Sequence, residues 1–312
     1  MIDHSLLRLD ASLKGKVWGG DRLKGLKGIS VFDESEGKLG ETWEVSCHKD
    51  GPSLFQGQSI GDLIDEAKLP YLVKFIDTTD NLSIQVHPDD DYAKRYENSK
   101  GKTECWLILS SDEGAGIYLG LKPGVSKKDL ESSLNRKDDL NHLLNFYPVK
   151  RGDFFYVPAG TIHAIGNGVT LAEVQQSSGI TYRVWDWNRL GVDGKARELH
   201  IEKSLDVINF APECNTKDYF CYQEFDKPSL KSLNLIKHDD FCIDIVNSEH
   251  YEVNKGEDDR RYHSLLVLEG EVDVLIGGKS YSLKGYDAGL VIKNETFEVI
   301  SNSSKAKYLH IY

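Results

Sequence analysis

Residues 82–88, with the sequence LSIQVHP, alternate apolar side chains with polar side chains that could bind a metal ion. Successive side chains on a β-strand point to opposite faces, so Ser83, Gln85 and His87 would share one face. A glutamine and a histidine on the same face offer an oxygen and an imidazole donor to a divalent metal. An ordinary half-exposed strand has the same pattern, and this segment alone does not choose between the two interpretations.

A glutamate enters an apolar segment at residues 102–109, KTECWLIL. Lys102, Glu104 and Trp106 would share one face of a strand, opposite an apolar face. Burying an unpaired carboxylate is costly, so Glu104 should pair with a cation or a metal ion. A structural contact between Lys102 and Glu104 meets the same need, and it is favoured when this segment is considered alone.

Residues 152–167, GDFFYVPAGTIHAIGN, resemble the second sequence motif of the cupins, G-x5-P-x-G-x2-H-x3-N. Every fixed position is filled, by Gly152, Pro158, Gly160, His163 and Asn167. The proline and glycine favour a tight turn that returns the histidine to the mouth of a barrel. Five fixed positions are far more specific than a lone histidine, which is usually a packed core residue.

Taken together, these segments resemble the class I, cupin-type mannose-6-phosphate isomerases, and most closely their short bacterial branch. The resemblance runs from about residue 17 to about residue 205. It rests on the segments VWGG, YLVKFIDTTDNLSIQVHPDD, KTECWLIL, VPAGTIHAI and TYRVWDWNR.

The resemblance implies a zinc ion held by Gln85, His87, Glu104 and His163. Oxygen and imidazole donors suit zinc at an open catalytic site, although the same set would accept cobalt or manganese. Gln85 stands where the common first cupin motif has a histidine, and Glu104 follows His87 by 17 residues. Both departures are expected of the isomerases and weigh against a cupin dioxygenase with a histidine-rich iron site.

The resemblance also implies roles around the metal. Arg183 and Lys102 would be catalytic, and Ser83 and Lys102 would bind substrate. By their own positions, Glu173 would face the cavity as a candidate second acid/base, and Glu173 and Trp18 are also expected to bind substrate. Each assignment has a structural alternative. Arg183 could pair with Asp186 or Glu173, Glu173 could pair with Lys102 or Arg183, and Trp18 could simply pack in the core.

The reaction implied is the interconversion of mannose 6-phosphate and fructose 6-phosphate through a cis-enediol. The partner is then a small phosphorylated sugar. A regulatory cupin that binds a sugar phosphate without turnover is the main alternative, and another aldose–ketose isomerase that uses zinc is a second.

Short runs rich in Val, Ile, Tyr, Phe and Trp predict the strands that position these residues. We expect a mostly β protein with two cupin, jelly-roll-like β-barrels in tandem and a few inserted helices. The strands are expected at 71–77, 82–87, 104–109, 153–158, 169–175 and 181–187, and the helices at about 88–99, 126–146 and 198–209.

A polar segment at 211–217 is expected to link a metal-binding catalytic domain, residues 1–210, to a second barrel, residues 211–312. In the second unit Gly277-Gly278 predicts a hairpin turn. Phe297 stands near the position of a motif histidine, and His263 and His310 look isolated and structural. We therefore expect the second barrel to be metal-free.

Composition narrows the class of protein. The chain of 312 residues has a formal net charge of -12, which argues against a general nucleic-acid surface. It contains no apolar run of about 18 residues and no signal-peptide pattern, so we expect no membrane span and a cytoplasmic location. The five cysteines suggest neither a disulfide framework nor a thiolate zinc site. A monomer or a homodimer is expected.

Overall fold

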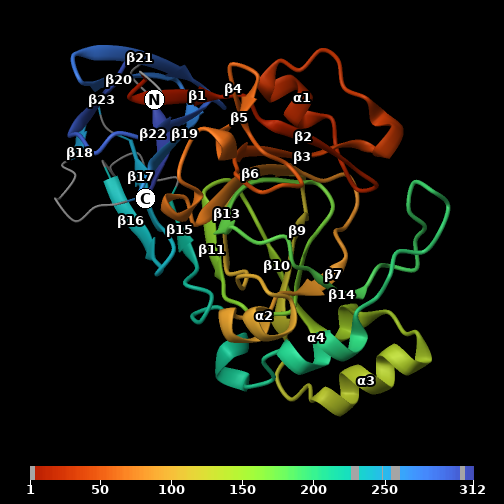
Figure 1. The fold of residues 1–312 in the computed structure, drawn as a ribbon. Helices are drawn as coiled ribbons and strands as arrows, with labels where there is room; N and C mark the ends of the chain where they lie inside the picture. The colour runs from red at the N-terminus through yellow and green to blue at the C-terminus, as the bar shows by residue number, and fades with distance from the viewer. Residues whose placement is uncertain (1–3, 226–231, 248, 254–260, 303–305) are drawn as a thin grey trace.

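The computed structural model describes residues 4–225, 232–247, 249–253, 261–302 and 306–312, which form a mostly β protein of the cupin type (Figure 1). Two barrels, each made of two antiparallel sheets, account for most of the strands. The helices α2 (Asp90–Tyr96), α3 (Lys127–Arg136) and α4 (Ile201–Val207) cluster at the end of the first barrel that lies away from the second (Figure 1).

The first barrel pairs a seven-stranded sheet with a five-stranded sheet. The seven-stranded sheet has the order β15-β11-β8-β13-β6-β3-β2, with β2 (Ser12–Lys16), β3 (Lys38–Val45), β6 (Tyr71–Asp77), β8 (Glu104–Ser111), β11 (Asp153–Val157), β13 (Val169–Gln176) and β15 (Gln223–Glu224). The five-stranded sheet has the order β10-β9-β12-β7-β14, with β7 (Ile84–Val86), β9 (Gly116–Leu121), β10 (Leu144–Pro148), β12 (His163–Ile165) and β14 (Tyr182–Trp185). Apolar side chains from both sheets share one buried cluster, so the sheets pack face to face.

The second barrel pairs a six-stranded sheet with a four-stranded sheet. The six-stranded sheet has the order β1-β22-β19-β24-β17-β16, with β1 (Leu6–Leu9), β16 (Ser232–Lys237), β17 (Cys242–Val246), β19 (His263–Glu269), β22 (Ala288–Val291) and β24 (Lys307–Ile311). The four-stranded sheet has the order β18-β23-β20-β21, with β18 (His250–Val253), β20 (Glu271–Ile276), β21 (Lys279–Lys284) and β23 (Phe297–Ser301). A small separate sheet holds β4 (Leu54–Phe55) and β5 (Gln58–Ser59).

Strand pairing crosses the predicted division at residue 210 in both directions. Strand β1 pairs with β22, so the start of the chain belongs to the second barrel. Strand β15 pairs with β11, so the first barrel continues beyond residue 210. The predicted linker at 211–217 also packs on the first barrel, where the Asn215 side chain accepts a hydrogen bond from the backbone N–H of Leu121 at 2.7 Å. These pairings join residues far apart in the sequence and leave no local signal.

The predicted strands of the first barrel are all present, with bounds within two residues of those observed. The predicted helix at 88–99 is α2 (Asp90–Tyr96), whose first turn is capped by Asp89, and the helix near 198–209 is α4 (Ile201–Val207). The remaining helical elements are α1 (Arg22–Lys27), α3 (Lys127–Arg136), η1 (Glu34–Glu36), η2 (Ile60–Asp62), η3 (Glu66–Lys68), η4 (Leu140–Leu143) and η5 (Pro212–Asn215).

The single helix predicted for 126–146 is wrong in length. Its start is confirmed, because Ser126 caps the first turn of α3 in a capping box with Asp129. The helix ends at Arg136 because Lys137 adopts a left-handed conformation, with φ 59°, and caps it. The later residues of the segment form η4 and then β10, which pairs with β9.

The hairpin predicted at Gly277-Gly278 is confirmed. The two glycines join β20 to β21, and both have positive φ values, 57° and 74°. This is the pair of left-handed residues that a two-residue type I′ turn requires.

One buried apolar cluster joins the two barrels. It contains Leu7 from β1, Phe75 from β6, Cys105 from β8, and Leu266 and Leu290 from the second barrel. The Tyr71 hydroxyl adds a buried hydrogen bond across the same interface, 2.9 Å from Ser264 Oγ. Burial of apolar surface is the dominant favourable term in such an interface.

Two further features bear on the sequence-based expectations. Among the described residues, no helix combines the length and the apolar character needed to cross a membrane. All five cysteines lie in the described part of the chain, and each is a free thiol.

The inter-barrel cluster predicts a stability effect. Leu7 is fully buried, so Leu7→Ala should lower the free energy of unfolding by about 2–5 kcal/mol through lost burial and a residual cavity. Val31 is 85% exposed, and Val31→Ala should change that free energy by no more than about 0.5 kcal/mol. Urea unfolding followed by circular dichroism measures both, and equal effects would contradict the assigned packing.

Candidate active site

One wall of the site is the central part of the five-stranded sheet. His163 on β12 lies directly opposite Gln85 on β7, and Gln85 lies opposite Arg183 on β14. Residues directly opposite in antiparallel strands project from the same face. Strand register therefore aligns three of the predicted site residues in a row across neighbouring strands.

The turn before His163 explains the glycine of the motif. Gly160 has φ 84°, in the left-handed region that favours glycine. A Cβ atom at this position would lie 3.0 Å from the backbone oxygen of Val207. The Gly160 N–H donates to the backbone oxygen of His87 at 2.8 Å, which ties the turn to the end of β7. The turn thus joins the segments that carry the two histidines.

The facing wall belongs to the seven-stranded sheet. Glu104 on β8 lies opposite Gln175 on β13, and Glu173 on β13 lies opposite both Trp106 on β8 and Lys74 on β6. These positions share the inward face, whereas Cys105, between Glu104 and Trp106, points into the inter-barrel cluster. The alternation predicted for residues 102–109 is confirmed.

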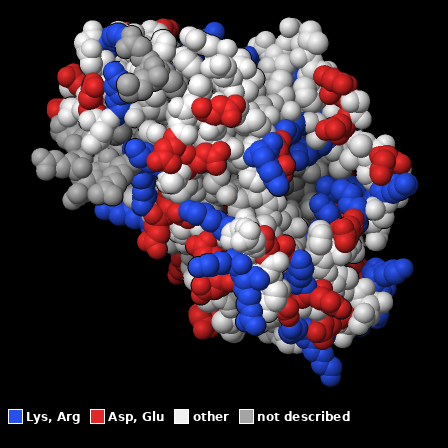
Figure 2. All heavy atoms as spheres, viewed as in Figure 1, with Lys and Arg blue, Asp and Glu red and all other residues white. Residues whose placement is uncertain are grey.

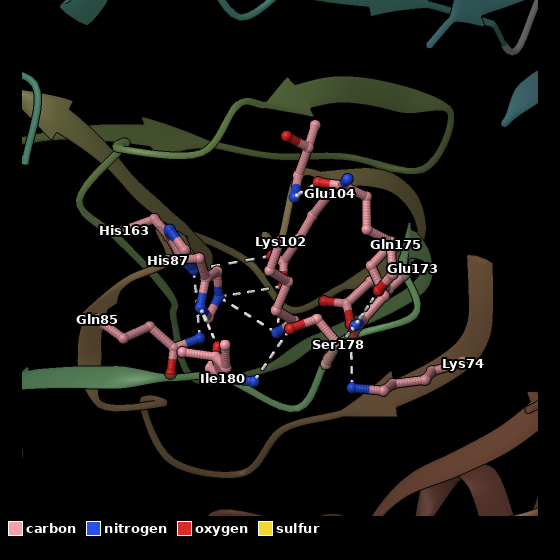
Figure 3. A network of polar contacts seen from close by, with 12 residues as sticks. Lys74, Gln85, His87, Lys102, Glu104, His163, Glu173, Gln175, Ser178 and Ile180 are labelled. Atoms are coloured by element: carbon pink, nitrogen blue, oxygen red, sulfur yellow. Dashed lines mark hydrogen bonds and ion pairs between the residues drawn. The ribbon is translucent and has the colours of Figure 1, made fainter. Parts of the chain in front are cut away.

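The two walls bring three predicted ligands together, as Figure 3 shows. One potential ligand atom from each of His87, Glu104 and His163 lies within 4.8 Å of the other two. His87 Nε2 lies 3.2 Å from Glu104 Oε1, and His163 Nε2 lies 3.7 Å from Glu104 Oε2. All three side chains are buried. This is the one such cluster of histidine, cysteine and acidic residues in the part of the chain that the structure describes.

Both histidines are oriented for metal binding by backbone carbonyl groups. His87 Nδ1 lies 2.8 Å from the oxygen of Ile180, and His163 Nδ1 lies 2.9 Å from the oxygen of Thr161. A carbonyl oxygen only accepts, so each Nδ1 carries the hydrogen and each Nε2 presents a lone pair. Burial lowers the pKa of His163 and, with the charge of Lys102, lowers the pKa of His87 to about 3. Both rings are therefore neutral at pH 7, as a metal ligand must be.

The Glu104 carboxylate fits a cation. Both its oxygens are buried, and neither accepts a hydrogen bond of good geometry from the described residues. Burial acts to raise the pKa of Glu104, but the charge of Lys102 is the chief cause that holds that pKa well below its ordinary value. Lys102 Nζ lies 2.6 Å from Glu104 Oε1, so the structural contact considered from the sequence is present. A buried, ionised carboxylate beside two imidazole lone pairs is a donor set that suits zinc.

Gln85 reaches the cluster with its amide nitrogen. Gln85 Nε2 lies 3.2 Å from His163 Nε2, while its Oε1 accepts a hydrogen bond from Ser83 Oγ at 3.4 Å. A half-turn of the amide group would exchange these two atoms and direct the oxygen toward the cluster. Gln85 therefore lies beside the cluster with its amide nitrogen toward His163, and its role as a ligand stays a prediction.

A cavity of about 300 Å³ opens beside the cluster. Its lining includes the predicted residues Trp18, Ser83, Gln85, Lys102, Glu173 and Arg183. The charged part of the lining consists of six cations and three carboxylates, namely Lys14, Lys16, Lys74, Lys102, Arg183, Arg197, Glu41, Asp50 and Glu173. Figure 2 shows acidic and basic side chains interspersed over the visible face of the molecule. The excess of cations in the cavity contrasts with the net charge of -12 for the chain and suits an anionic ligand.

Arg183 makes neither of the carboxylate pairs considered from the sequence. Its Nη1 donates to the backbone oxygen of Glu198 at 2.8 Å, and among the described residues its buried Nε has no hydrogen-bond partner. Asp186 pairs instead with Arg189 and Arg197. Burial, and then the charge of Arg197, lower the pKa of Arg183. An anion bound in the cavity would relieve this crowding of positive charge.

Glu173 pairs with a residue that the sequence reasoning overlooked. Its Oε1 lies 3.3 Å from Lys74 Nζ, and its Oε2 accepts from Trp106 Nε1 at 3.1 Å. Burial, and then the charge of Glu104, raise the pKa of Glu173. Trp18 both lines the cavity and packs in the core of the first barrel. The substrate-binding role and the packing role considered from the sequence are therefore compatible.

The sequence analysis missed several other residues of the cavity, among them Lys74, Glu41 and Arg197. Lys74 is a charged residue in the middle of an apolar strand, which is a usable signal because buried charges need partners. Glu41 on β3 carries the same signal, and although burial acts to raise its pKa, Lys16 and Lys74 hold that pKa at about 2. Arg197 lies in a polar loop and has no distinctive local pattern.

His263 and His310 are not isolated, which corrects the interpretation made from sequence. His263 Nδ1 lies 2.8 Å from His310 Nε2, and the rings stack with centroids 5.0 Å apart. Strands β19 and β24, which carry them, are neighbours in the six-stranded sheet. Pairing across strands brought together two residues that are 47 positions apart.

The fold and the site together define a cupin-type protein with a buried candidate metal cluster beside a cation-lined cavity. The family model "Phosphomannose isomerase type I, catalytic domain" matches residues 6–110. The mannose-6-phosphate isomerase of Streptococcus mutans is 42% identical over 304 residues, covering 90% of each chain. A mannose-6-phosphate isomerase of Bacillus subtilis is 33% identical over 292 residues, covering 88% of this chain and 89% of the relative.

Structural similarity agrees with these matches. A crystal structure of the Bacillus subtilis mannose 6-phosphate isomerase aligns with a TM-score of 0.84 and 29% identity, covering 99% of this chain and all of the other. The chain belongs to the type I mannose-6-phosphate isomerase family, and it is an enzyme of the isomerase class.

The neutral state of His87 predicts a pH dependence. Its pKa is about 3 in the folded protein and about 6.5 when unfolded, so the unfolded chain binds the extra proton between these values. The contribution of neutral His87 to the free energy of unfolding is fully present above pH 6.5. It is lost as the pH falls toward 3, by up to about 1.4 kcal/mol per pH unit.

Urea unfolding of the protein at pH 7, 6 and 5, with a chelator present, measures this slope. In His87→Gln the slope should be smaller by about one proton. Identical slopes in the two proteins would show that His87 is protonated in the folded state.

Proposed function

We propose that this chain interconverts mannose 6-phosphate and fructose 6-phosphate, with one zinc ion held by Gln85, His87, Glu104 and His163. The observation that carries the proposal is the buried Glu104 carboxylate, which faces the Nε2 atoms of two histidines beside a cation-rich cavity. Relatives named mannose-6-phosphate isomerase, with 42% and 33% identity over most of the chain, supply the substrate.

Zinc suits the donor set, because imidazole nitrogens and a carboxylate oxygen are its usual ligands at catalytic sites. When bound, it would supply Lewis-acid stabilisation of the negative charge that develops on the two reacting sugar oxygens. The carbonyl contacts at Nδ1 of His87 and His163 hold both rings in the required tautomer. The same ligands would also accept cobalt or manganese, which are the alternatives to the proposed zinc.

The isomerisation moves a proton between C2 and C1 of the open-chain sugar through a cis-enediol. Arg183 neighbours Gln85 across the strand pair, and its guanidinium would stabilise the enediolate oxygens. Lys102 lies beside Glu104 and lines the cavity, so its ammonium would contact substrate hydroxyls or the proton in transfer. We therefore assign Arg183 and Lys102 as catalytic residues.

Ser83, Lys102, Glu173 and Trp18 are proposed to bind the substrate, because all four line the cavity. The six cations of the lining would accommodate the phosphate dianion, since hydrogen bonds between ionised partners are the stronger kind. We also propose a cytoplasmic location, with the five free thiols as support, and a monomer or a homodimer as the active form. The second barrel is proposed to be metal-free.

The first test is conversion and metal content in the wild type and in His163→Ala. With zinc added, the wild type should form fructose 6-phosphate from mannose 6-phosphate and bind about one zinc per chain, as an open three- or four-ligand site would. His163→Ala should lose roughly 100-fold or more in zinc affinity, together with conversion. Metal analysis beside a coupled assay measures both quantities.

The matched control is His142→Ala, because His142 is exposed on η4 and lies outside the cluster. It should keep both zinc and turnover. A wild type that binds mannose 6-phosphate without forming any ketose would instead identify a regulatory sugar-phosphate-binding protein.

A second variant separates metal binding from catalysis. Arg183→Ala should retain its zinc but lose about 10²- to 10³-fold in kcat, because the positive charge beside the enediolate is removed. Arg136→Ala, at the exposed end of α3, should behave as the wild type. Loss of zinc from Arg183→Ala would show that Arg183 supports the ligands rather than the reaction.

A further inference from the structure

Lys102 contacts the same atoms that are proposed to bind the metal. Its Nζ lies 2.6 Å from Glu104 Oε1 and 3.2 Å from His87 Nε2. The side chain is 7% exposed, so its charge is almost wholly removed from water. Figure 3 shows the ammonium between the glutamate and the histidine ring, within the ligand cluster.

An ammonium group and a metal ion would both be bound by these atoms. The ammonium is only a donor, and at His87 Nε2 it contacts the one lone pair that the neutral ring can offer to a metal ion. Two cations a few ångströms apart also repel each other strongly where little water screens them. The contact of Lys102 with His87 Nε2 and a metal ion bound to that atom therefore exclude each other.

We propose that Lys102 is an internal competitor for the metal: its ammonium balances the charge of Glu104 until an ion binds and is then displaced toward the substrate cavity. The inference rests on the proposed metal site. Lys102 already lines the cavity with Ser83 and Glu173, so the displaced ammonium has a polar, solvent-connected destination. Metal loading and delivery of the proposed catalytic lysine to the substrate are then one event.

A neighbouring lysine supplies a matched control. Lys74 is also buried and also lines the cavity, but its Nζ pairs with Glu173 Oε1 at 3.3 Å. Removing the charge of Lys74 changes the electrostatic potential of the cavity and leaves the contacts of Lys102 in place. Comparison of the two lysines therefore separates direct competition from a general effect of charge.

The test is zinc affinity, measured by competition with a chromophoric chelator at pH 7.5. Lys102→Met should bind zinc at least about tenfold more tightly than the wild type, because it removes a repelling charge close to the ion. Lys74→Met should bind zinc within about threefold of the wild type, because its charge is more distant. Lys102→Gln, which is neutral but polar, serves if the methionine variant does not fold.

Thermal unfolding gives a second readout. With a chelator present, Lys102→Met should melt at a lower temperature than the wild type, because Glu104 loses its ion pair. Zinc should then raise the melting temperature of the variant more than it raises that of the wild type, since a tighter ligand stabilises more.

A third readout uses the unmodified chain. Mass spectrometry after brief treatment with acetic anhydride should find Lys102 acetylated at least about threefold more in the presence of zinc, because displacement exposes its nitrogen. Lys74 should show no such change. Equal or lower acetylation of Lys102 with zinc would overturn the displacement.

The Glu104→Gln variant distinguishes failure of the proposed competition from failure of the proposed metal site. If the wild type binds one zinc that Glu104→Gln does not, while the Lys102 variants bind no more tightly, the competition is wrong and the proposed metal site stands. If the wild type binds no zinc that depends on Glu104, the metal site itself is wrong, and the competition falls with it.

Discussion

The rest of the structure depends on the negative charge of Glu104, a carboxylate that is 1% exposed. Water does not solvate it, so cations must balance it where it lies. Lys102 does so at 2.6 Å, and the two facing histidines present lone pairs that an ammonium or a metal ion can use. A buried charge of this kind costs stability unless it is partnered, so its presence indicates a chemical role.

The second barrel supports the strand that carries Glu104. Strand β8 directs Glu104 and Trp106 inward and Cys105 outward, into the cluster that joins the barrels. The second barrel thus packs against the back of the sheet that carries the carboxylate. It includes β1 from the start of the chain, which pairs with β22, so both ends of the sequence support one site. Rigid strands of this kind hold ligands more accurately than loops do.

The cations of the cavity are preorganised by carboxylates that do not neutralise them fully. Lys16 pairs with Glu41, Lys74 with Glu173, and Arg197 with Asp186. These ion pairs fix the positions of the cations before a ligand arrives, which reduces the entropy lost on binding. An acidic chain can therefore attract a phosphorylated sugar through a local potential that its net charge does not reveal.

Local sequence patterns alone predicted much of the fold and of the candidate site. Strand alternation predicted that Gln85 and His87 share one face, and the proline–glycine turn predicted that His163 returns to the mouth of the barrel. Only the tertiary structure decided which strands are neighbours, and hence that Arg183 lies opposite Gln85, that Glu173 pairs with Lys74 and that β1 joins the second barrel. It also ended α3 at Arg136, where the chain turns to pair β10 with β9. Alternation and capping act over a few residues, whereas strand pairing joins residues far apart in the chain and is selected by the packing of whole sheets.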